Sequence, residues 1–376
     1  MFSVRLYGVS LSLCHLLAGC GGADTSWDGG VPGVDAGATA DGGEVTSPGD
    51  AGEPADGGEA LDAGTPDAGT SCPNGQVCVD QFPFTHGGDS SLDGSSVFNA
   101  YSCAPTLNES GNERVYRVTV PAAGFLSAAV RESAGVDVDV HILSALDAQA
   151  CLSRGNFHAK ADVSAGTYYV VVDTYVSAGV PQAGAYEVDI GFLEPSVGPC
   201  DLQSGVMPRV NDNGNPLAMP ATGKVAREAH LVTREEPAPY PASPTDELAA
   251  HHALSQARTG LVMHRSEPWA PLEGGNFYGC GIGSPSAFPV EHEAWYVNMY
   301  WTSAARPPKG TKMIFTQGSR AVVVAAGYET GPGDLSFIGG TPEETHFYMG
   351  TTHGSVMTLG IAADPSIPFG PRTCTP

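Results

Sequence analysis

The C-terminal half of the chain is rich in candidate metal ligands. Catalytic zinc sites combine imidazole and carboxylate ligands around a position that stays open to water, so such residues could support metal-assisted hydrolysis. The residues in question are His230, His251, His252, His264, His292, His346 and His353. No two of them have the His-x-x-x-His spacing of a zinc-binding helix, and His251 and His252 are adjacent in the sequence. We therefore predict scattered histidines, with no metal ion and no cofactor.

Aromatic residues in the same half could bind carbohydrate, because sugar rings stack their C–H faces on exposed aromatic rings. The candidate binding residues are Trp269, Trp295, Tyr296, Tyr300 and Trp301, with Phe277 and Tyr278 nearby in the sequence. Tyrosine and tryptophan are equally common in the cores of small β domains. The residues alone thus allow either a polysaccharide-binding groove or an ordinary core.

Asp137 and Asp139 alternate with valine and are candidate calcium ligands, since hard cations take oxygen ligands. Calcium needs six to eight oxygens, which two carboxylates do not provide. The alternative is the solvated face of a strand, and we favour it.

One acidic residue could act as a catalytic acid. The segments Pro308–Phe315, Gly318–Val324 and Tyr328–Pro332 resemble the double-psi β-barrel of rare lipoprotein A and expansin-like proteins. That resemblance implies a Gly-Thr strand, a Gly-Arg turn, a valine-rich strand and then an acid before Gly-Pro, where Glu329 stands. In wall-lytic members such an acid would protonate the glycosidic oxygen.

The chain departs from that pattern in two places. The family's following Asp-Leu-Ser segment is replaced by Gly339–Glu344, and Thr302–Arg306 contains no matching histidine. Glu329 as an exposed turn carboxylate therefore remains the alternative to catalysis.

The N-terminus predicts export and a lipid anchor. Arg5 precedes an apolar run, Leu6–Ala18, of signal-peptide length, and the run ends in Leu17-Ala18-Gly19-Cys20. These four residues resemble the bacterial lipobox. The resemblance implies that residues 1–19 are removed and that Cys20 carries palmitate-type acyl chains, which bury methylenes in the membrane at about 0.8 kcal/mol each. An ordinary secretory signal is the alternative.

Composition predicts that residues 20–71 form a disordered stalk. Gly21–Ser71 holds eleven acidic residues and neither lysine nor arginine. Such a segment buries too little apolar surface to offset its chain entropy, and its charges repel one another. The whole chain has a formal charge of −24, which argues against nucleic acid as a partner.

Residues 72–195 read as a β-sandwich. Val115–Val120 and Phe125–Val130 alternate and are separated by a short Pro-Gly segment, which predicts a hairpin. Val136–Ile142 alternates valine or isoleucine with Asp137, Asp139 and His141, which predicts one buried and one wet face. Short strands with Gly and Pro turns and no helical period are typical of an antiparallel sandwich.

The same region resembles the bacterial pre-peptidase C-terminal domain. The resemblance is carried by Val115–Val118, Ala123–Leu126, Asp137–Val140, Ala165–Val172 and Gly184–Val188. It implies a small, jelly-roll-like sandwich that is appended to secreted enzymes and is not itself catalytic. Some members bind polymeric substrates or calcium.

The sequence pattern of residues 200–376 predicts a small β-barrel with one helix packed on it. The helix is expected at Asp246–Arg258, where apolar residues recur at helical spacing. The expected strands are short and apolar: Trp295–Trp301, Lys312–Thr316, Arg320–Ala325, His346–Met349 and Val356–Ala362. The chain is thus mainly β, with a disordered stalk before the two β regions.

Seven of the nine cysteines remain once Cys14 is cleaved off and Cys20 is acylated. An exported chain favours disulfides, although sequence alone does not assign them. The pairs that stay within one folded region are Cys72–Cys78, Cys103–Cys151 and Cys280–Cys374, and they leave Cys200 unpaired.

These features predict a lipid-anchored protein of the bacterial outer membrane or cell surface that binds peptidoglycan or another polysaccharide without catalysis. The first alternative is a peptidoglycan hydrolase or lytic transglycosylase that uses Glu329. The second is a purely structural envelope protein.

Overall fold

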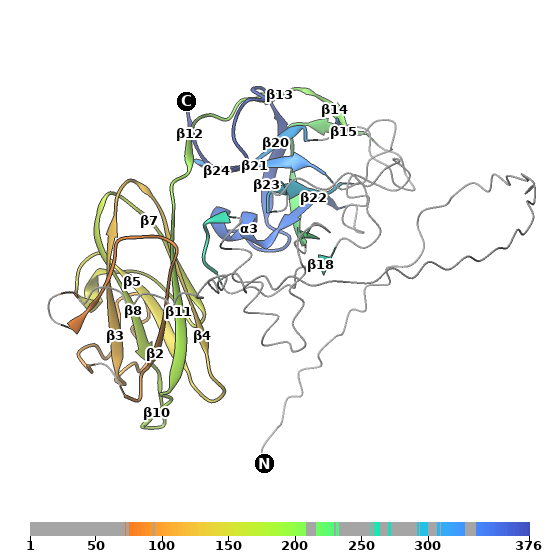
Figure 1. Ribbon diagram of the computed structural model, residues 1–376. Helices are drawn as coiled ribbons and strands as arrows, with labels where there is room; N and C mark the ends of the chain where they lie inside the picture. Colours follow the sequence, from red (N-terminus) through yellow and green to blue (C-terminus); the bar gives the residue numbers. More distant parts are fainter. Residues whose placement is uncertain are drawn as a thin grey trace, which may run out of the picture. The chain divides into compact units, whose positions relative to one another are not determined.

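The computed structural model describes residues 72, 75–92, 95–207, 216–228, 231–232, 256, 259–263, 270–271, 292, 294–299, 307–308, 310–327 and 336–376 (Figure 1). The predicted signal peptide, Cys20 and the stalk lie outside these residues. Of the predicted helix Asp246–Arg258, only Gln256 is described. In this part of the chain, no helix has the length and apolarity needed to cross a bilayer.

The first folded region is the expected β-sandwich (Figure 1). One sheet contains, in spatial order, β1 (Val77–Val79), β3 (Glu113–Val120), β8 (Gly166–Thr174), β5 (Val138–Leu143) and β6 (Cys151–Gly155). The other contains β2 (Phe84–Asp89), β11 (Ala185–Leu193), β4 (Gly124–Glu132) and β7 (His158–Val163). A short ribbon, β9 (Val176–Ser177) with β10 (Val180–Pro181), and a 3-10 turn, η2 (Ala148–Ala150), complete it. Only β1 and β3 pair in parallel; the other ladders of the two sheets are antiparallel.

The core of the sandwich consists of alternate residues from both sheets, with Val118, Val140, Val172 and Val188 fully buried among them. Branched residues at every second position place one apolar face against the other sheet, as a sandwich requires.

The hairpin predicted for Val115–Val120 and Phe125–Val130 is wrong. β3 pairs with β1 and β8, whereas β4 pairs with β11 and β7, so the two strands belong to different sheets. The chain crosses from one layer to the other between Val120 and Gly124, a segment that begins with Pro121. Alternation fixes which side chains point inward, but it does not identify the neighbouring strand.

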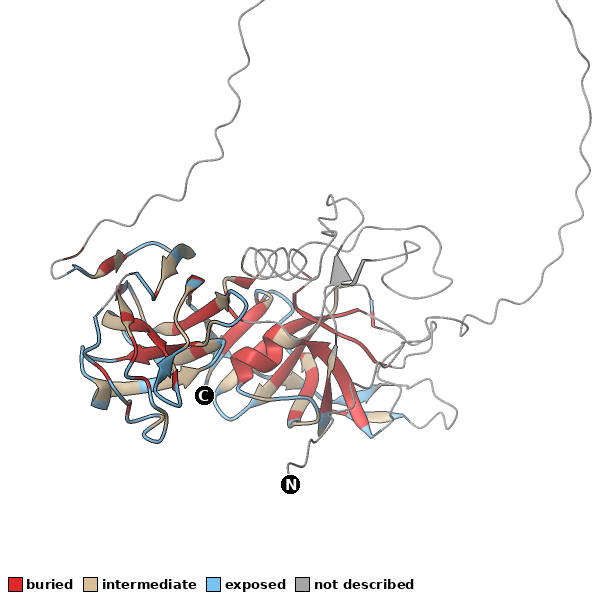
Figure 2. Ribbon diagram, turned by 90° about the horizontal axis from the view of Figure 1, so that it is seen from below, coloured by how far each residue is buried: buried red, intermediate tan, exposed pale blue. Residues whose placement is uncertain are grey.

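The wet face predicted for β5 is also wrong, because all six residues of this strand are buried. Residues 95–112 lie over that face of the sheet. Phe98 and Tyr101 from this segment pack with Leu143 and Val171 in a second, smaller core. Figure 2 shows that buried residues are concentrated in the strands. We call residues 95–112 the covering loop.

Nine of the described strands of the C-terminal region form one open sheet. Its main path runs β12 (Ser196–Pro199), β24 (Gly370–Thr375), β21 (Arg320–Ala326), β20 (Lys312–Gln317), β23 (Val356–Ala362), β16 (Ala221–Glu228) and β22 (Phe337–Pro342). β13 (Leu202–Gln203) pairs with β23, and β19 (Tyr296–Val297) pairs with β21. Two small ribbons join β14 (Gly205–Met207) to β15 (Leu217–Met219) and β17 (Leu231–Val232) to β18 (Ala270–Pro271).

The predicted small β-barrel is therefore corrected. The strand ladders among the described residues form an open sheet, and they do not close into a barrel. A single isolated bridge between Asn298 and Gly340 brings the end of β19 to β22. The predicted strands at 312–316, 320–325 and 356–362 correspond to β20, β21 and β23.

The strand predicted at His346–Met349 is wrong, because this segment belongs to helix α3 (Glu343–Met349). Glu343 and Glu344 occupy its first turn, where carboxylates interact favourably with the helix dipole. Gly350 ends the helix in the left-handed conformation, which costs glycine little. The apolar residues at the end of the segment resemble a buried strand, but the acidic first turn and the glycine after the last residue favour a helix.

Three disulfides are present among the described residues. Cys72–Cys78 and Cys103–Cys151 agree with the expected pairs. Cys374 bonds to Cys200 and not to Cys280, which lies outside the described residues. The physical reason is strand pairing: β12 runs parallel to β24 and brings the end of β12 to Cys374.

Candidate functional site: a buried charged network

Strand pairing gathers four charged or titratable residues on the face of the sheet beneath the covering loop. Asp139 lies opposite Asp173 on the neighbouring strand β8, and His141 lies opposite Arg154 on β6. Because side chains alternate along a strand, these residues share the face opposite to the core valines. The covering loop adds Glu109 and Tyr101.

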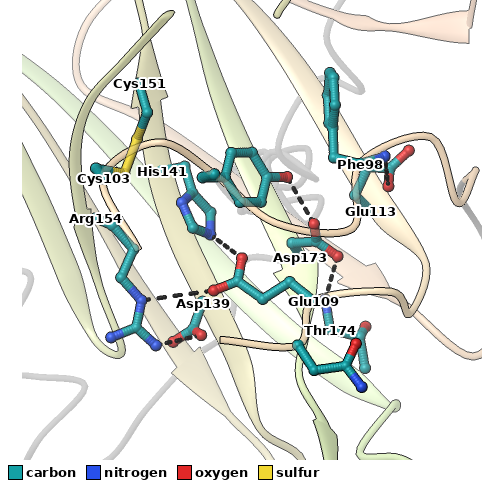
Figure 3. A network of polar contacts seen from close by, with 12 residues as sticks. Phe98, Cys103, Glu109, Glu113, Asp139, His141, Cys151, Arg154, Asp173 and Thr174 are labelled. Carbon is teal, nitrogen blue, oxygen red and sulfur yellow. Dashed lines mark hydrogen bonds and ion pairs between the residues drawn. A yellow bond between two sulfur atoms is a disulfide. The ribbon is translucent and has the colours of Figure 1, made fainter. Parts of the chain in front are cut away.

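The centre of the network is a fully buried pair, Glu109 and His141. Both side chains have no exposed surface, and His141 Nε2 lies 2.6 Å from Glu109 Oε2 (Figure 3). Arg154 Nε lies 3.7 Å from Glu109 Oε1, and the same guanidinium donates a hydrogen bond to Asp139. One arginine thus faces two buried carboxylates.

A second group joins the covering loop to β8. The Tyr101 hydroxyl donates to Asp173 Oδ2 at 2.6 Å, and the Thr174 amide donates to Asp173 Oδ1 at 2.7 Å. The Tyr101 ring stacks on the His141 ring, with centroids 3.7 Å apart. These contacts connect the two halves of the network through one aromatic residue.

Glu113 on β3 holds the start of the covering loop. Its carboxylate accepts hydrogen bonds from the Ser95 hydroxyl at 2.6 Å and from the Val97 amide at 2.9 Å. Charge-assisted bonds of this kind are stronger than neutral ones. The loop is therefore fastened by Glu113 at one end, by Cys103–Cys151 in the middle and by Glu109 near the other end.

Burial dominates the electrostatics of the network. It raises the pKa of Asp173 to about 9 and that of Asp139 to about 6, and it raises the pKa of Glu109. It lowers the pKa of His141 to about 3. Removal from water disfavours the charged form of each group, so at neutral pH Asp173 is protonated and His141 is neutral.

The network stabilises the covering loop on the sheet; it does not form an exposed catalytic centre. Perturbed pKa values often mark active sites, but structural networks perturb them too. A general acid or base must reach its substrate, and Glu109, His141 and Asp173 are closed off from solvent.

The pH dependence of stability tests the protonation of Asp173. A carboxyl whose folded pKa is raised stabilises the fold fully below pH 3.8, and this contribution is lost as the pH rises towards about 9. Asp173→Asn keeps an oxygen that can accept from the Thr174 amide, and it places an uncharged amide nitrogen beside the Tyr101 hydroxyl, which must then turn from donor to acceptor. We expect a higher urea midpoint than in the wild type at pH 8, with the difference vanishing near pH 4. A lower midpoint at pH 8 would show that Asp173 is ionised in the folded protein.

The calcium candidates occupy different environments. Asp139 is buried and bonded to Arg154, so a cationic side chain already neutralises it. Asp137 is partly exposed, and burial together with the neighbouring Asp139 charge raises its pKa. The arrangement fits an internal ion pair better than a cation site, because a metal ion would have to displace the guanidinium.

The aromatic candidates that the structure describes are core residues. Trp295 is 5% exposed and Tyr296 is 2% exposed; Trp295 belongs to the core of the C-terminal sheet. Rings that are covered in this way cannot stack on a sugar. Trp269, Tyr300, Trp301 and the catalytic candidate Glu329 lie outside the described residues.

The described histidines of the C-terminal region do not cluster around a shared point. His346 is buried, with Nδ1 2.9 Å from the Thr351 hydroxyl and Nε2 3.1 Å from the Ala226 carbonyl. Burial lowers its pKa to about 4. It is a core histidine with both nitrogens in use.

The C-terminal sheet contains a hollow of about 400 Å³, which we call the β20–β23 hollow. It combines polar side chains with prolines and aliphatic groups. Its lining comprises Gln203, Val206, Pro307, Pro308, Gly310, Thr311, Lys312, Ile361, Ala362 and Pro365.

Sequence reasoning missed Glu109, Tyr101, Arg154 and Asp173 as partners of one network. The available signal was the Asp-x-Asp-x-His alternation of β5 together with the Cys103–Cys151 pair. In the structure, the disulfide to the neighbouring strand β6 holds the chain around Cys103 close to His141. Combining the two observations would have placed a cover over these polar residues.

No protein-family model and no curated protein matches this chain. Among solved structures, the pre-peptidase C-terminal domain of a collagenase from Bacillus anthracis is 17% identical over 31% of this chain and 95% of that chain, with a TM-score of 0.21. An inhibitor of g-type lysozyme from the periplasm of Aeromonas hydrophila is 13% identical over 31% and 96%, with a TM-score of 0.22. At these TM-scores the description of the sandwich rests on its own strand pairing, and membership of the pre-peptidase family stays an expectation.

Proposed function

We propose that this chain is an exported, lipid-anchored protein of the bacterial cell envelope that binds cell-wall or extracellular polysaccharide without catalysis. The observation that supports export is the set of three disulfides. Structural disulfides form and persist in oxidising compartments such as the periplasm and the cell surface.

The anchor and the stalk fit the same role. Acylation of Cys20 would attach the mature chain to a membrane, and the acidic stalk would separate the folded regions from it. Such a tether suits a protein whose ligand is a fixed polymer near the membrane.

The buried network gives no support for catalysis in the sandwich. Its titratable groups hold the covering loop and cannot meet a substrate.

The β20–β23 hollow is the binding site that we propose. Sugars present hydroxyl groups beside apolar C–H faces, and this hollow presents Gln203 and Lys312 beside Val206 and several prolines. The Lys312 ammonium donates to the Ile367 carbonyl and lies over the Phe369 ring, which fixes its position. A fixed donor costs less entropy on binding than a mobile one.

Co-sedimentation with purified peptidoglycan tests this function. The detergent-solubilised mature chain should pellet with the polymer and release no muropeptides. Val206→Asp places a charge in the hollow at a side chain that is 64% exposed and should weaken binding at least tenfold, about 1.4 kcal/mol. Val180→Asp, at a 59% exposed valine of β10, is the matched control and should bind normally.

The same experiment separates the alternatives. Muropeptide release that disappears in Glu329→Gln would replace this proposal by the hydrolase or transglycosylase function. Failure to pellet with peptidoglycan or with other polysaccharides, together with no release, would leave a structural envelope protein. Equal binding by Val206→Asp and the wild type would place the ligand elsewhere.

A further inference from the structure

Three potential metal ligands meet where the covering loop joins the sheet. The sulfurs of Cys103 and Cys151 and a ring nitrogen of His141 lie within 4.8 Å of one another. Each comes from a different segment: the covering loop, β6 and β5. Cys103 is exposed, Cys151 is partly buried and His141 is fully buried.

His141 is oriented as metal-binding histidines are. Its Nε2 lies 2.6 Å from the Glu109 carboxylate, and both of its ring nitrogens are buried without a hydrogen-bond partner in the described part of the chain. Figure 3 shows the ring between the carboxylate and the disulfide. A carboxylate on one nitrogen commonly orients a histidine whose other nitrogen ligates a metal ion.

The sulfurs are bonded to each other, and in this state they are not metal ligands. A dithiol can reduce the bond: two electrons and two protons pass to the sulfurs, which become two thiols, and the dithiol becomes a disulfide. Zinc then binds the two sulfurs as thiolates and displaces their two protons.

The distances suit a tetrahedral ion. Zinc bonds of about 2.3 Å to sulfur and about 2.0 Å to nitrogen place neighbouring ligand atoms between about 3.5 and 3.8 Å apart. Three ligand atoms that already lie within 4.8 Å of one another reach these separations with small side-chain movements. The two sulfurs must move apart from the length of a disulfide bond to about 3.8 Å.

We propose that reduction of the Cys103–Cys151 disulfide creates a zinc site made of Cys103, Cys151 and His141, with Glu109 orienting the histidine. Three protein ligands leave the fourth position of the tetrahedron to water or another small ligand. The site is separate from the β20–β23 hollow, and it does not depend on the proposed polysaccharide function.

Equilibrium dialysis against zinc, with elemental analysis, tests the proposal on the full mature chain. A phosphine reduces the disulfides, and it is oxidised to the phosphine oxide with an oxygen from water. The reduced wild type should bind one zinc ion that the oxidised protein does not bind. Cys103→Ala/Cys151→Ala should lose this ion, whereas Cys72→Ala/Cys78→Ala is the matched control and should keep it.

Two further variants separate ligation from folding. Glu109→Gln should weaken zinc binding between about tenfold and a hundredfold, as loss of an orienting carboxylate does. His141→Phe preserves a ring against Tyr101 and should abolish binding while far-ultraviolet circular dichroism stays unchanged. Failure of the reduced wild type to bind zinc, or full binding by folded His141→Phe, would overturn the proposal.

Discussion

Replacing Cys200 and Cys374 by alanine is expected to lower the free energy of unfolding of the C-terminal region by about 5 kcal/mol. These cysteines are 174 residues apart, and a cross-link that closes a long loop restricts the unfolded chain strongly. The bond also fastens the pairing of β12 with β24 at the edge of the sheet. No other change of two residues proposed for this protein has a larger expected effect.

Tryptophan fluorescence in urea measures this loss selectively. Residues 72–195 contain no tryptophan, so Trp269, Trp295 and Trp301 report on the C-terminal region, with Trp27 in the stalk. Cys72→Ala/Cys78→Ala is the matched control, and its unfolding is followed by far-ultraviolet circular dichroism because this bond lies in the region without tryptophan. Those cysteines are 6 residues apart, and the same reasoning gives a loss of about 2 kcal/mol. Equal losses in the two variants would contradict the argument from loop length.

Replacing Arg154 by methionine is expected to destabilise the sandwich by about 3 kcal/mol or more. The guanidinium faces both Asp139 and Glu109, and its removal leaves these buried carboxylates without their cation. Breaking a buried ion pair from one side is costly because the remaining charge keeps its desolvation penalty.

Urea unfolding followed by far-ultraviolet circular dichroism checks this expectation. Arg117→Met is the matched control, since Arg117 lies in the same sheet on β3, is only partly exposed and has no ion-pair partner in the described part of the chain. Arg117→Met should lower the free energy of unfolding by less than about 1 kcal/mol. Adding Asp139→Asn and Glu109→Gln to Arg154→Met should restore part of the loss, because the orphaned charges disappear. A loss in Arg154→Met no larger than in the control would mean that the network does not stabilise the fold.

The sequence predicted those strands whose environment depends mainly on their own residues. Strands β8 and β11 contain buried branched residues in a continuous or alternating pattern. Strands β20, β21 and β23 are short apolar runs between turns that contain glycine or charged residues. Such patterns identify a strand whatever its neighbours are.

Predictions from the sequence were wrong where contacts with distant segments determine burial or pairing. Asp139 and His141 look solvated on their own strand, and only the covering loop buries them. Cys200 looked unpaired because nothing local indicates that β12 runs beside β24. His346–Met349 looked like a strand because its apolar run outweighed Glu343, Glu344 and Gly350, which begin and end a helix.

The candidate site also depends on segments that are distant in the sequence. Its residues come from the covering loop, β3, β5, β6 and β8, so no contiguous motif encodes it. The charged residue types are visible in the sequence. Their burial, which raises the pKa of Asp173 and Asp139 and lowers that of His141, depends on the covering loop. The polysaccharide hypothesis relied on aromatic residues of which the two described ones, Trp295 and Tyr296, pack in the interior.

Membrane partitioning of the full-length chain and of Cys20→Ser, expressed in a bacterium with a lipoprotein pathway, tests the central claim most directly. If acyl groups at Cys20 hold the chain on a membrane outside the cytoplasm, as we propose, the wild type should be recovered with membranes and enter a detergent phase. Cys20→Ser lacks the thiol that carries the lipid and should be recovered in the soluble fraction. Unchanged membrane recovery of Cys20→Ser, or a wild-type N-terminal peptide with an unmodified thiol by mass spectrometry, would contradict the account.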